Sequence, residues 1–112
     1  MRDATKDRRE ALFEEAARIV EREYAGDLDL AGVARRVATS RRQLQRVFAE
    51  VGGTTFRRRL AEVRMERAAE LLRDGDLPVA AVARRVGYRH PAEFAKAFRR
   101  HYGAPPSRLR VH

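Results

Sequence analysis

Residues 33–48 read VARRVATSRRQLQRVF, a stretch in which two short helical patterns are separated by a brief break. Apolar residues spaced i, i+3, i+4 and i+7 mark one buried face of a helix. Such a stripe occurs before the break (Leu30, Val33, Ala34, Val37) and again after it (Leu44, Val47, Phe48, Val51). The break at Ser40 leaves room only for a tight turn. The stretch therefore predicts a helix-turn-helix unit, whose first helix is capped by Asp29.

The second of these helices also carries polar residues on the face opposite its apolar stripe. The residues on that face repeat the same spacing and are Arg42, Gln45, Arg46 and Ala49. Long hydrogen-bonding side chains on one exposed ridge suit the major groove of DNA. The alternative is a solvated helix face, which is the usual place of exposed charge. The surrounding helix-turn-helix pattern favours the DNA-reading interpretation.

Composition and charge limit the classes of protein. The 112 residues have room for one domain or two very small ones, and 44% apolar residues is enough for modest cores. The formal net charge is +9, and residues 28–112 alone carry 19 basic and 8 acidic side chains. Such an excess attracts polyanions, of which nucleic acid is the commonest in a cell, with an anionic membrane surface as the rival.

Several other kinds of site and segment are missing from the sequence. Cysteine is absent, which excludes disulfides and thiolate metal sites. The first ten residues lack the apolar segment of a signal peptide, and no apolar run approaches membrane-spanning length. His90, His101 and His112 share no metal-like spacing, and no nucleophile has an evident base. We therefore expect a cytoplasmic protein that has no cofactor or metal and is not an enzyme.

Periodicity and cap residues predict three further helices. Residues 7–24 have one apolar face and charge on the other. Thr54 or Thr55 offers an N-cap for a helix of about 19 residues that continues through Arg73. A short final helix, residues 107–110, follows a pair of prolines.

The helix-turn-helix pattern occurs a second time later in the chain. The letters VARRV of residues 33–37 reappear at residues 82–86, an offset of 49. After one extra residue in the turn, three more positions match at an offset of 50 (Leu44, Phe48 and Gly53 with Phe94, Phe98 and Gly103). This internal repeat predicts a second unit of the same kind. The aromatic residues Phe48, Phe94, Phe98 and Tyr102 are expected in the core rather than as stacking platforms for bases.

Together these patterns predict an all-α protein of about seven helices, in which a long linker helix joins two helix-turn-helix subdomains. Residues 1–54 would hold the first helix and the first helix-turn-helix, and residues 55–74 the linker helix. Residues 75–112 would hold the second helix-turn-helix and the short C-terminal helix. Arg64 lies near the apolar side of the linker, so we expect it in a structural ion pair at the subdomain junction rather than on DNA.

Four sequence motifs span nearly the whole chain. They are SRRQLQRVF at residues 40–48 followed by Gly53, R-x-x-x-A-x-x-L-L at residues 64–72, V-A-x-x-V-G-Y at residues 82–88, and F-x-x-x-F-x-x-x-x-G-x-x-P at residues 94–106. Together they resemble the DNA-binding region of the AraC/XylS family of bacterial transcription regulators, and the chain is similar to its short stand-alone members. The resemblance implies two recognition helices that enter successive major grooves on one face of the DNA.

The resemblance also implies which residues read bases. Those of the first recognition helix are Arg42, Gln45 and Arg46. Those of the second fall on Pro91, Ala92, Ala95 and Lys96, of which only Lys96 has a long polar side chain. Residues expected at phosphates or flanking positions are Ser40, Arg41, Arg57, Arg89, His90 and Arg99. Arg57 begins a basic run that opposes the dipole of the linker helix, which either a phosphate contact or tolerance of an exposed run explains.

We therefore expect a sequence-specific transcription regulator that binds double-stranded DNA as a monomer at an asymmetric site, because two linked units in one chain need no palindrome. Two rival functions stay open. A sequence-independent architectural or RNA-coating protein would need only the positive charge. An adaptor would use the acidic first helix to dock a protein such as RNA polymerase, with DNA as a secondary ligand.

Overall fold

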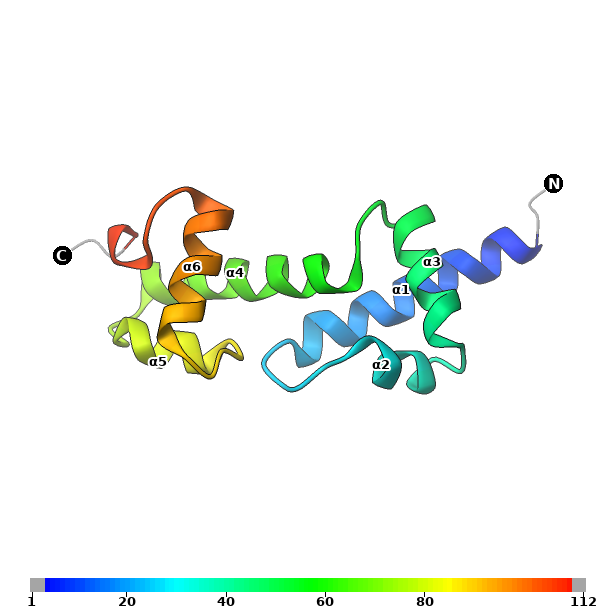
Figure 1. Ribbon diagram of the computed structural model, residues 1–112, viewed down its shortest axis with the longest axis horizontal. Helices are drawn as coiled ribbons and strands as arrows, with labels where there is room; N and C mark the ends of the chain where they lie inside the picture. The colour runs from blue at the N-terminus through cyan, green and yellow to red at the C-terminus, as the bar shows by residue number, and fades with distance from the viewer. Residues whose placement is uncertain (1–3, 110–112) are drawn as a thin grey trace. The chain divides into compact units, whose positions relative to one another are not determined.

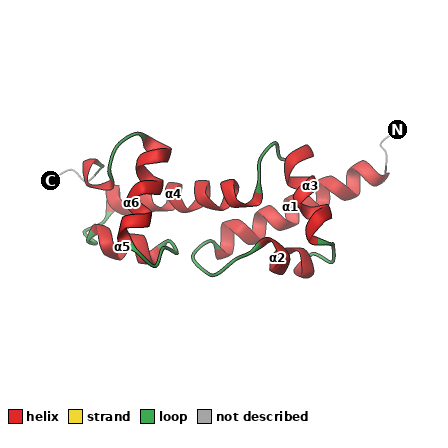
Figure 2. Cartoon of the chain, viewed as in Figure 1, coloured by secondary structure: helices red, strands yellow, loops and turns green. Residues whose placement is uncertain are grey.

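The computed structural model describes the backbone of residues 4–109 and the side chains of residues 6–109. Its elements are α1 (Ala4–Glu23), α2 (Leu30–Arg36), α3 (Arg41–Glu50), α4 (Phe56–Asp74), α5 (Val79–Arg85), α6 (Pro91–Tyr102) and the 3₁₀ helix η1 (Pro106–Arg108). Loops join these elements, and no strand occurs in this part of the chain (Figure 2). The predicted all-α fold is thereby confirmed. The expected final helix included Arg110, which lies outside the described residues.

The described residues form two compact units, which we call unit 1 and unit 2. Unit 1 contains residues 4–23 and 27–60, and unit 2 contains residues 24–26 and 61–109. Helix α4 crosses the division after Leu60, so its residues are shared between the two units. Each unit includes one helix-turn-helix, made of α2 and α3 in unit 1 and of α5 and α6 in unit 2 (Figure 1).

Side-chain caps fix where three of the helices begin. The carboxylate of Asp29 accepts a hydrogen bond of 2.7 Å from the backbone N–H of Gly32, as the sequence predicted. The hydroxyl of Ser40 accepts one of 3.0 Å from the backbone N–H of Gln43 at the start of α3. The hydroxyl of Thr55, one of the two predicted candidates, accepts one of 3.1 Å at the start of α4. Each cap satisfies a backbone donor that has no partner within the helix.

The core of unit 1 is built largely from the predicted apolar stripes. Its buried members are Ala16, Val20, Val33, Ala34, Val37, Leu44, Val47, Phe48, Phe56 and Leu60. Val51 was predicted to belong to the stripe of α3, but its side chain is 37% exposed. That prediction is wrong because α3 ends at Glu50 and the ring of Phe13 packs against the chain at Gly52 instead.

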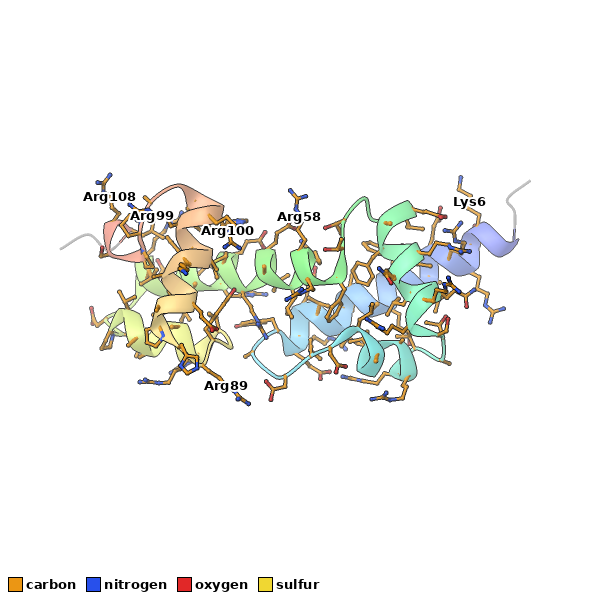
Figure 3. The ribbon with its side chains drawn as sticks, in the orientation of Figure 1. Lys6, Arg58, Arg89, Arg99, Arg100 and Arg108 are labelled. Carbon is orange, nitrogen blue, oxygen red and sulfur yellow. The ribbon has the colours of Figure 1, made fainter. Side chains whose placement is uncertain are left out.

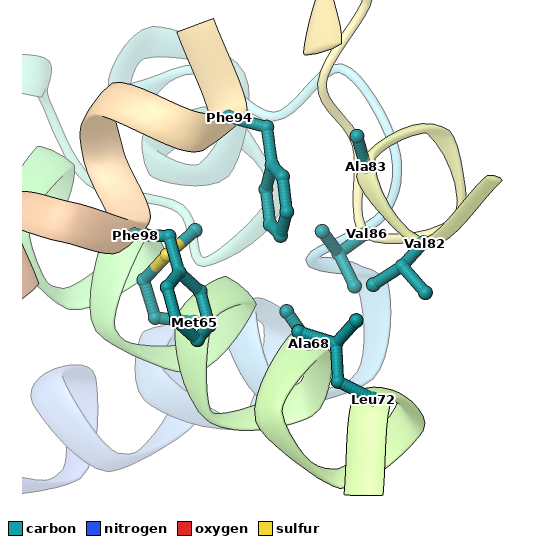
Figure 4. Packing of buried hydrophobic residues seen from close by; sticks show 8 residues of the cluster. All are labelled: Met65, Ala68, Leu72, Val82, Ala83, Val86, Phe94 and Phe98. Carbon is teal, nitrogen blue, oxygen red and sulfur yellow. The ribbon is translucent and has the colours of Figure 1, made fainter. Parts of the chain in front are cut away.

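The core of unit 2 brings together side chains from three helices (Figure 4). They are Met65, Ala68 and Leu72 of α4, Val82, Ala83 and Val86 of α5, and Phe94 and Phe98 of α6. Tyr102 was also predicted in the core, but it is 40% exposed. Its ring contacts Phe98, while its hydroxyl donates a hydrogen bond of 3.3 Å to the carbonyl of Met65. Tyrosine can cover a core in this way because one face of it is apolar and its tip is polar.

The turn between the two helices is hydrogen-bonded in the same way in both units. In unit 1, the N–H of Thr39 donates to the carbonyl of Ala34 at 2.9 Å. In unit 2, the N–H of Tyr88 donates to the carbonyl of Ala83, also at 2.9 Å. The same offset of 49 residues relates these pairs and the repeated letters of the sequence. The sequence repeat thus corresponds to a repeated backbone turn.

Candidate nucleic-acid interface

The exposed face of α3 carries the base-reading candidates of unit 1. Arg42, Gln45 and Arg46 are all exposed, on the side of the helix opposite the buried Leu44 and Phe48. Within the part of the chain that the structure describes, these three side chains have no hydrogen bond or ion pair with the protein. Two guanidinium groups and one amide therefore share a ridge on which their donors and acceptors are available to a ligand.

Local structure at the start of α3 holds this ridge in place. Ser40 caps the helix, and the exposed Arg41 occupies its first position. The hydroxyl of Thr39 donates a hydrogen bond of 3.1 Å to the side-chain oxygen of Gln43. The buried face of α3 fixes the rotation of the helix, and the cap and the turn fix where the helix begins. Together they determine which way the ridge points.

Helix α6 presents a different surface in unit 2. It begins at Pro91, after His90, whose side chain makes no capping hydrogen bond. Ala92 is exposed, Ala95 is half-buried and Lys96 is exposed. Methyl groups can contact thymine, but of the four base-reading candidates in α6 only Lys96 can donate a side-chain hydrogen bond to a base edge. The ridge of α6 therefore offers less chemistry for reading bases than the ridge of α3.

Several exposed arginines lie on α6 or close to it in the sequence. Arg89 precedes the helix, and Arg99 and Arg100 lie in its last turns (Figure 3). Arg84 and Arg85 end the neighbouring α5 and are also exposed. Arg84, Arg85 and Arg100 were not among the site residues predicted from the sequence. Their helical period could have identified them, because they lie away from the apolar stripes.

Unit 1 neutralises a cation whose counterpart in unit 2 has no acidic partner among the residues that the structure describes. The guanidinium of Arg36 donates two hydrogen bonds to the carboxylate of Glu23, at 2.6 and 2.7 Å. This interaction with Arg36 holds the pKa of Glu23 below its ordinary value. Arg85 is the repeat counterpart of Arg36, and no carboxylate among the described residues pairs with it. The exposed charge of unit 2 is therefore available to anions such as phosphates.

The arginines at the start of α4 differ in their surroundings. Arg59 forms an ion pair of 3.0 Å with Glu21 of α1, so an interaction within unit 1 explains this cation. Arg57 and Arg58 are exposed. Cations in a first helical turn oppose the helix dipole, which an external anion would offset. Arg57 therefore stays a candidate for a phosphate contact.

Arg64 contacts two backbone carbonyls and an aromatic ring. Its Nε donates a hydrogen bond of 2.8 Å to the carbonyl of Tyr24, and its Nη2 donates one of 3.0 Å to the carbonyl of Gly26. Its guanidinium carbon lies 5.5 Å from the centroid of the Tyr88 ring. These partners are backbone carbonyls and an aromatic face, and they do not test the predicted ion pair.

The described residues contain neither a metal-binding cluster nor a membrane-spanning helix. No group of three or more His, Asp or Glu side chains in residues 6–109 is placed so that it could hold a metal ion. None of the helices within that range combines the length and the apolar character needed to cross a membrane.

Residues 33–112 match a family described as "Helix-turn-helix domain". The HTH-type transcriptional regulator GlxA of Rhizobium meliloti is 34% identical over 100 residues, which cover 89% of this chain and 30% of that protein. The chain spans about a third of the length of the curated relatives that it matches.

Several solved structures have a similar fold. A transcriptional regulator from Chromobacterium violaceum, described as an AraC-type DNA-binding domain-containing protein, has a TM-score of 0.85 at 26% identity, covering 96% of this chain and 94% of that one. The C-terminal domain of AraT, a response regulator from Geobacillus stearothermophilus, superposes with a TM-score of 0.86 at 33% identity, covering 88% of this chain and 83% of that one. The DNA-binding domain of AdpA, a global transcriptional factor solved in complex with a target DNA, has a TM-score of 0.78 at 32% identity, covering 87% of this chain and 86% of that one.

Proposed function

Because this chain belongs to the AraC/XylS family of helix-turn-helix domains, we propose that it binds double-stranded DNA sequence-specifically and regulates transcription. The observation that carries the proposal is the ridge of α3. Arg42, Gln45 and Arg46 are exposed on one helix face and have no protein partner among the described residues. Guanidinium forks fit guanine O6 and N7, and a side-chain amide fits adenine N6 and N7. The ridge thus matches the edges that bases present in a major groove.

The two units are proposed to contribute differently to one binding site. Helix α3 reads bases through Arg42, Gln45 and Arg46, whereas α6 has only Lys96 for this purpose. Residues proposed at phosphates or flanking positions are Ser40, Arg41, Arg57, Arg89, His90 and Arg99. Phosphate contacts contribute affinity and register, and base contacts contribute specificity. Unit 1 would then supply most of the sequence preference.

We also propose that the protein binds as a monomer to an asymmetric site. One chain carries two recognition helices, so both half-sites can be occupied in successive major grooves without a second copy. The ridges of α3 and α6 bear different side chains, so the two half-sites should differ in sequence. The proposal places the protein in the cytoplasm, where double-stranded DNA is its ligand.

The adaptor function has less support from the structure. It requires acidic residues of α1 to be available to a protein such as RNA polymerase. Two of them are engaged within unit 1, since Glu21 pairs with Arg59 and Glu23 pairs with Arg36. Retention of RNA polymerase by the protein in DNA-free extract would nevertheless support an adaptor.

Selection of bound sites from random duplexes, followed by salt titration, tests the proposal. The selected duplex is compared with a scrambled duplex of equal length and composition. We expect affinity for both to fall steeply with salt, and the selected duplex to bind at least about 10³-fold more tightly at physiological salt. Equal affinities would contradict sequence-specific binding and leave the architectural function.

A further inference from the structure

The turn between α5 and α6 packs against a single guanidinium group. Gly87 has a φ of +106°, a conformation that favours glycine. A Cβ atom at Gly87 would lie 3.0 Å from three atoms of the Arg64 side chain. The ring of the next residue, Tyr88, lies beside the same guanidinium. Arg64 therefore occupies the space that any side chain at Gly87 would need.

Two backbone carbonyls hold the same guanidinium. They belong to Tyr24 and Gly26, at 2.8 and 3.0 Å, and this short segment is part of unit 2 together with Arg64. A planar guanidinium with donors at fixed angles can bond two carbonyls and lie near a ring at the same time. Lysine has the same charge, but its ammonium group has neither the fork nor the flat face.

Tyr88 connects this arrangement to α6. Its ring meets the ring of Phe94 at a centroid distance of 5.6 Å and an interplanar angle of 63°. Phe94 is fully buried in the first turns of α6. Tyr88 is half-buried, and burial raises its pKa, so the hydroxyl stays neutral at physiological pH. A change in the place of Tyr88 would therefore change the packing at the start of α6.

We propose that Arg64 is a positioning residue for DNA recognition by unit 2. It fixes the turn at Gly87 and Tyr88, and through Phe94 it sets the direction of α6 and of its base-reading candidate Lys96. Arg64 acts through this packing and not by touching DNA. The inference rests on the proposed function, because it names a residue on which DNA reading depends.

The test compares Arg64→Ala and Arg64→Lys with the matched control Arg67→Ala. Arg67 lies on the same helix, 5.8 Å from the ring of Tyr24 and 3.4 Å from Glu70, so its removal deletes an equal charge away from the turn. We expect both Arg64 variants to bind the selected duplex about tenfold more weakly, with the salt slope unchanged. Single-base variants should place the loss in the half-site under α6. Arg67→Ala should bind as the wild type does.

A direct DNA contact predicts a different pattern. Loss of a phosphate contact would lower the salt slope of Arg64→Ala by about 0.9, and Arg64→Lys would keep most of the affinity. Either result would overturn the positioning role. If Arg64→Ala does not fold, Arg64→Lys decides by the same criteria, because it retains the charge and most of the volume.

Backbone amide NMR spectra of the free proteins separate this inference from the proposed function. In Arg64→Lys the signals of Tyr88, Ala92 and Glu93 should shift, while those of Arg42 and Arg46 in α3 should not. Unchanged α6 signals would overturn the inference whether or not the protein discriminates between duplexes. Failure of the wild type to discriminate would instead overturn the proposed function.

Discussion

The ring of Phe13 in α1 meets the ring of Phe48 in α3 edge to face, with centroids 5.2 Å apart and planes at 73°. In unit 2, Tyr102 contacts Phe98 with centroids 4.7 Å apart. Phe98 is the repeat counterpart of Phe48, but Gly52 stands where the repeat places a counterpart of Tyr102. In unit 1 the ring that contacts Phe48 therefore comes from another helix, α1, whereas in unit 2 Tyr102 lies on the same helix as Phe98.

This packing predicts that Gly52→Ala destabilises unit 1. The added Cβ would lie 2.7 Å from Cζ of Phe13 and 2.9 Å from the carbonyl oxygen of Phe48. Overpacking of this kind costs about 1–3 kcal/mol of unfolding free energy, measurable by urea denaturation. In a Phe13→Ala background the same substitution should cost less, because the ring is gone. An equal cost in both backgrounds would show that Phe13 is not the obstacle.

Ala38 and Gly87 occupy equivalent places in the two turns, and both have positive φ, at +58° and +106°. A left-handed backbone costs alanine about 1–2 kcal/mol, whereas glycine costs about 0.5–1 kcal/mol in unfolded-state entropy. Ala38→Gly should therefore raise the unfolding free energy by about 0.5 kcal/mol. Gly87→Ala should lower it by about 1–3 kcal/mol, because the methyl group also meets Arg64. Thermal unfolding checks both signs, and destabilisation by Ala38→Gly would refute the strain argument.

Arg46 and Arg99 should have separable effects on DNA binding. Arg46→Ala is expected to relax base preference in one half-site, by about 1–3 kcal/mol of discrimination. Arg99→Ala should weaken binding nearly uniformly and lower the salt slope by about one. Both side chains are exposed, so helix content should stay unchanged in circular dichroism. Stronger base discrimination under α6 than under α3, measured on single-base variants, would reverse this assignment.

Glu23 makes the unfolding free energy of unit 1 depend on pH. Its hydrogen bonds with Arg36 lower its pKa from the ordinary value of 4.5. A carboxyl group with a lowered folded-state pKa stabilises the fold above its unfolded pKa, and this contribution is lost as pH falls through the folded pKa. The stability difference between wild type and Glu23→Gln should therefore be constant near neutral pH and shrink below about pH 4.5. Urea unfolding across this range measures it, and a difference independent of pH would contradict the assignment.

Much of the fold and of the α3 ridge could be predicted because the signals are local. Asp29 caps α2 within three residues, and the stripe through Leu44 and Phe48 places Arg42 and Arg46 on the opposite face. The predictions for Val51 and Tyr102 were wrong because both lie at or beside a helix end. The exposure of a side chain there depends on what packs against the helix end, and helical periodicity carries no information about that.

The sequence by itself determined the helices, the repeated turn and the identity of the side chains on the exposed ridges. Periodicity and capping act over a few residues, so they can be recognised without knowing the fold. Only the tertiary structure decided which cations are already engaged. Arg36 reaches a carboxylate 13 residues away, and Arg64 reaches a carbonyl 40 residues away. Such pairings depend on how helices pack, so the division between cations held by the protein and cations available to a ligand appears only in the folded chain.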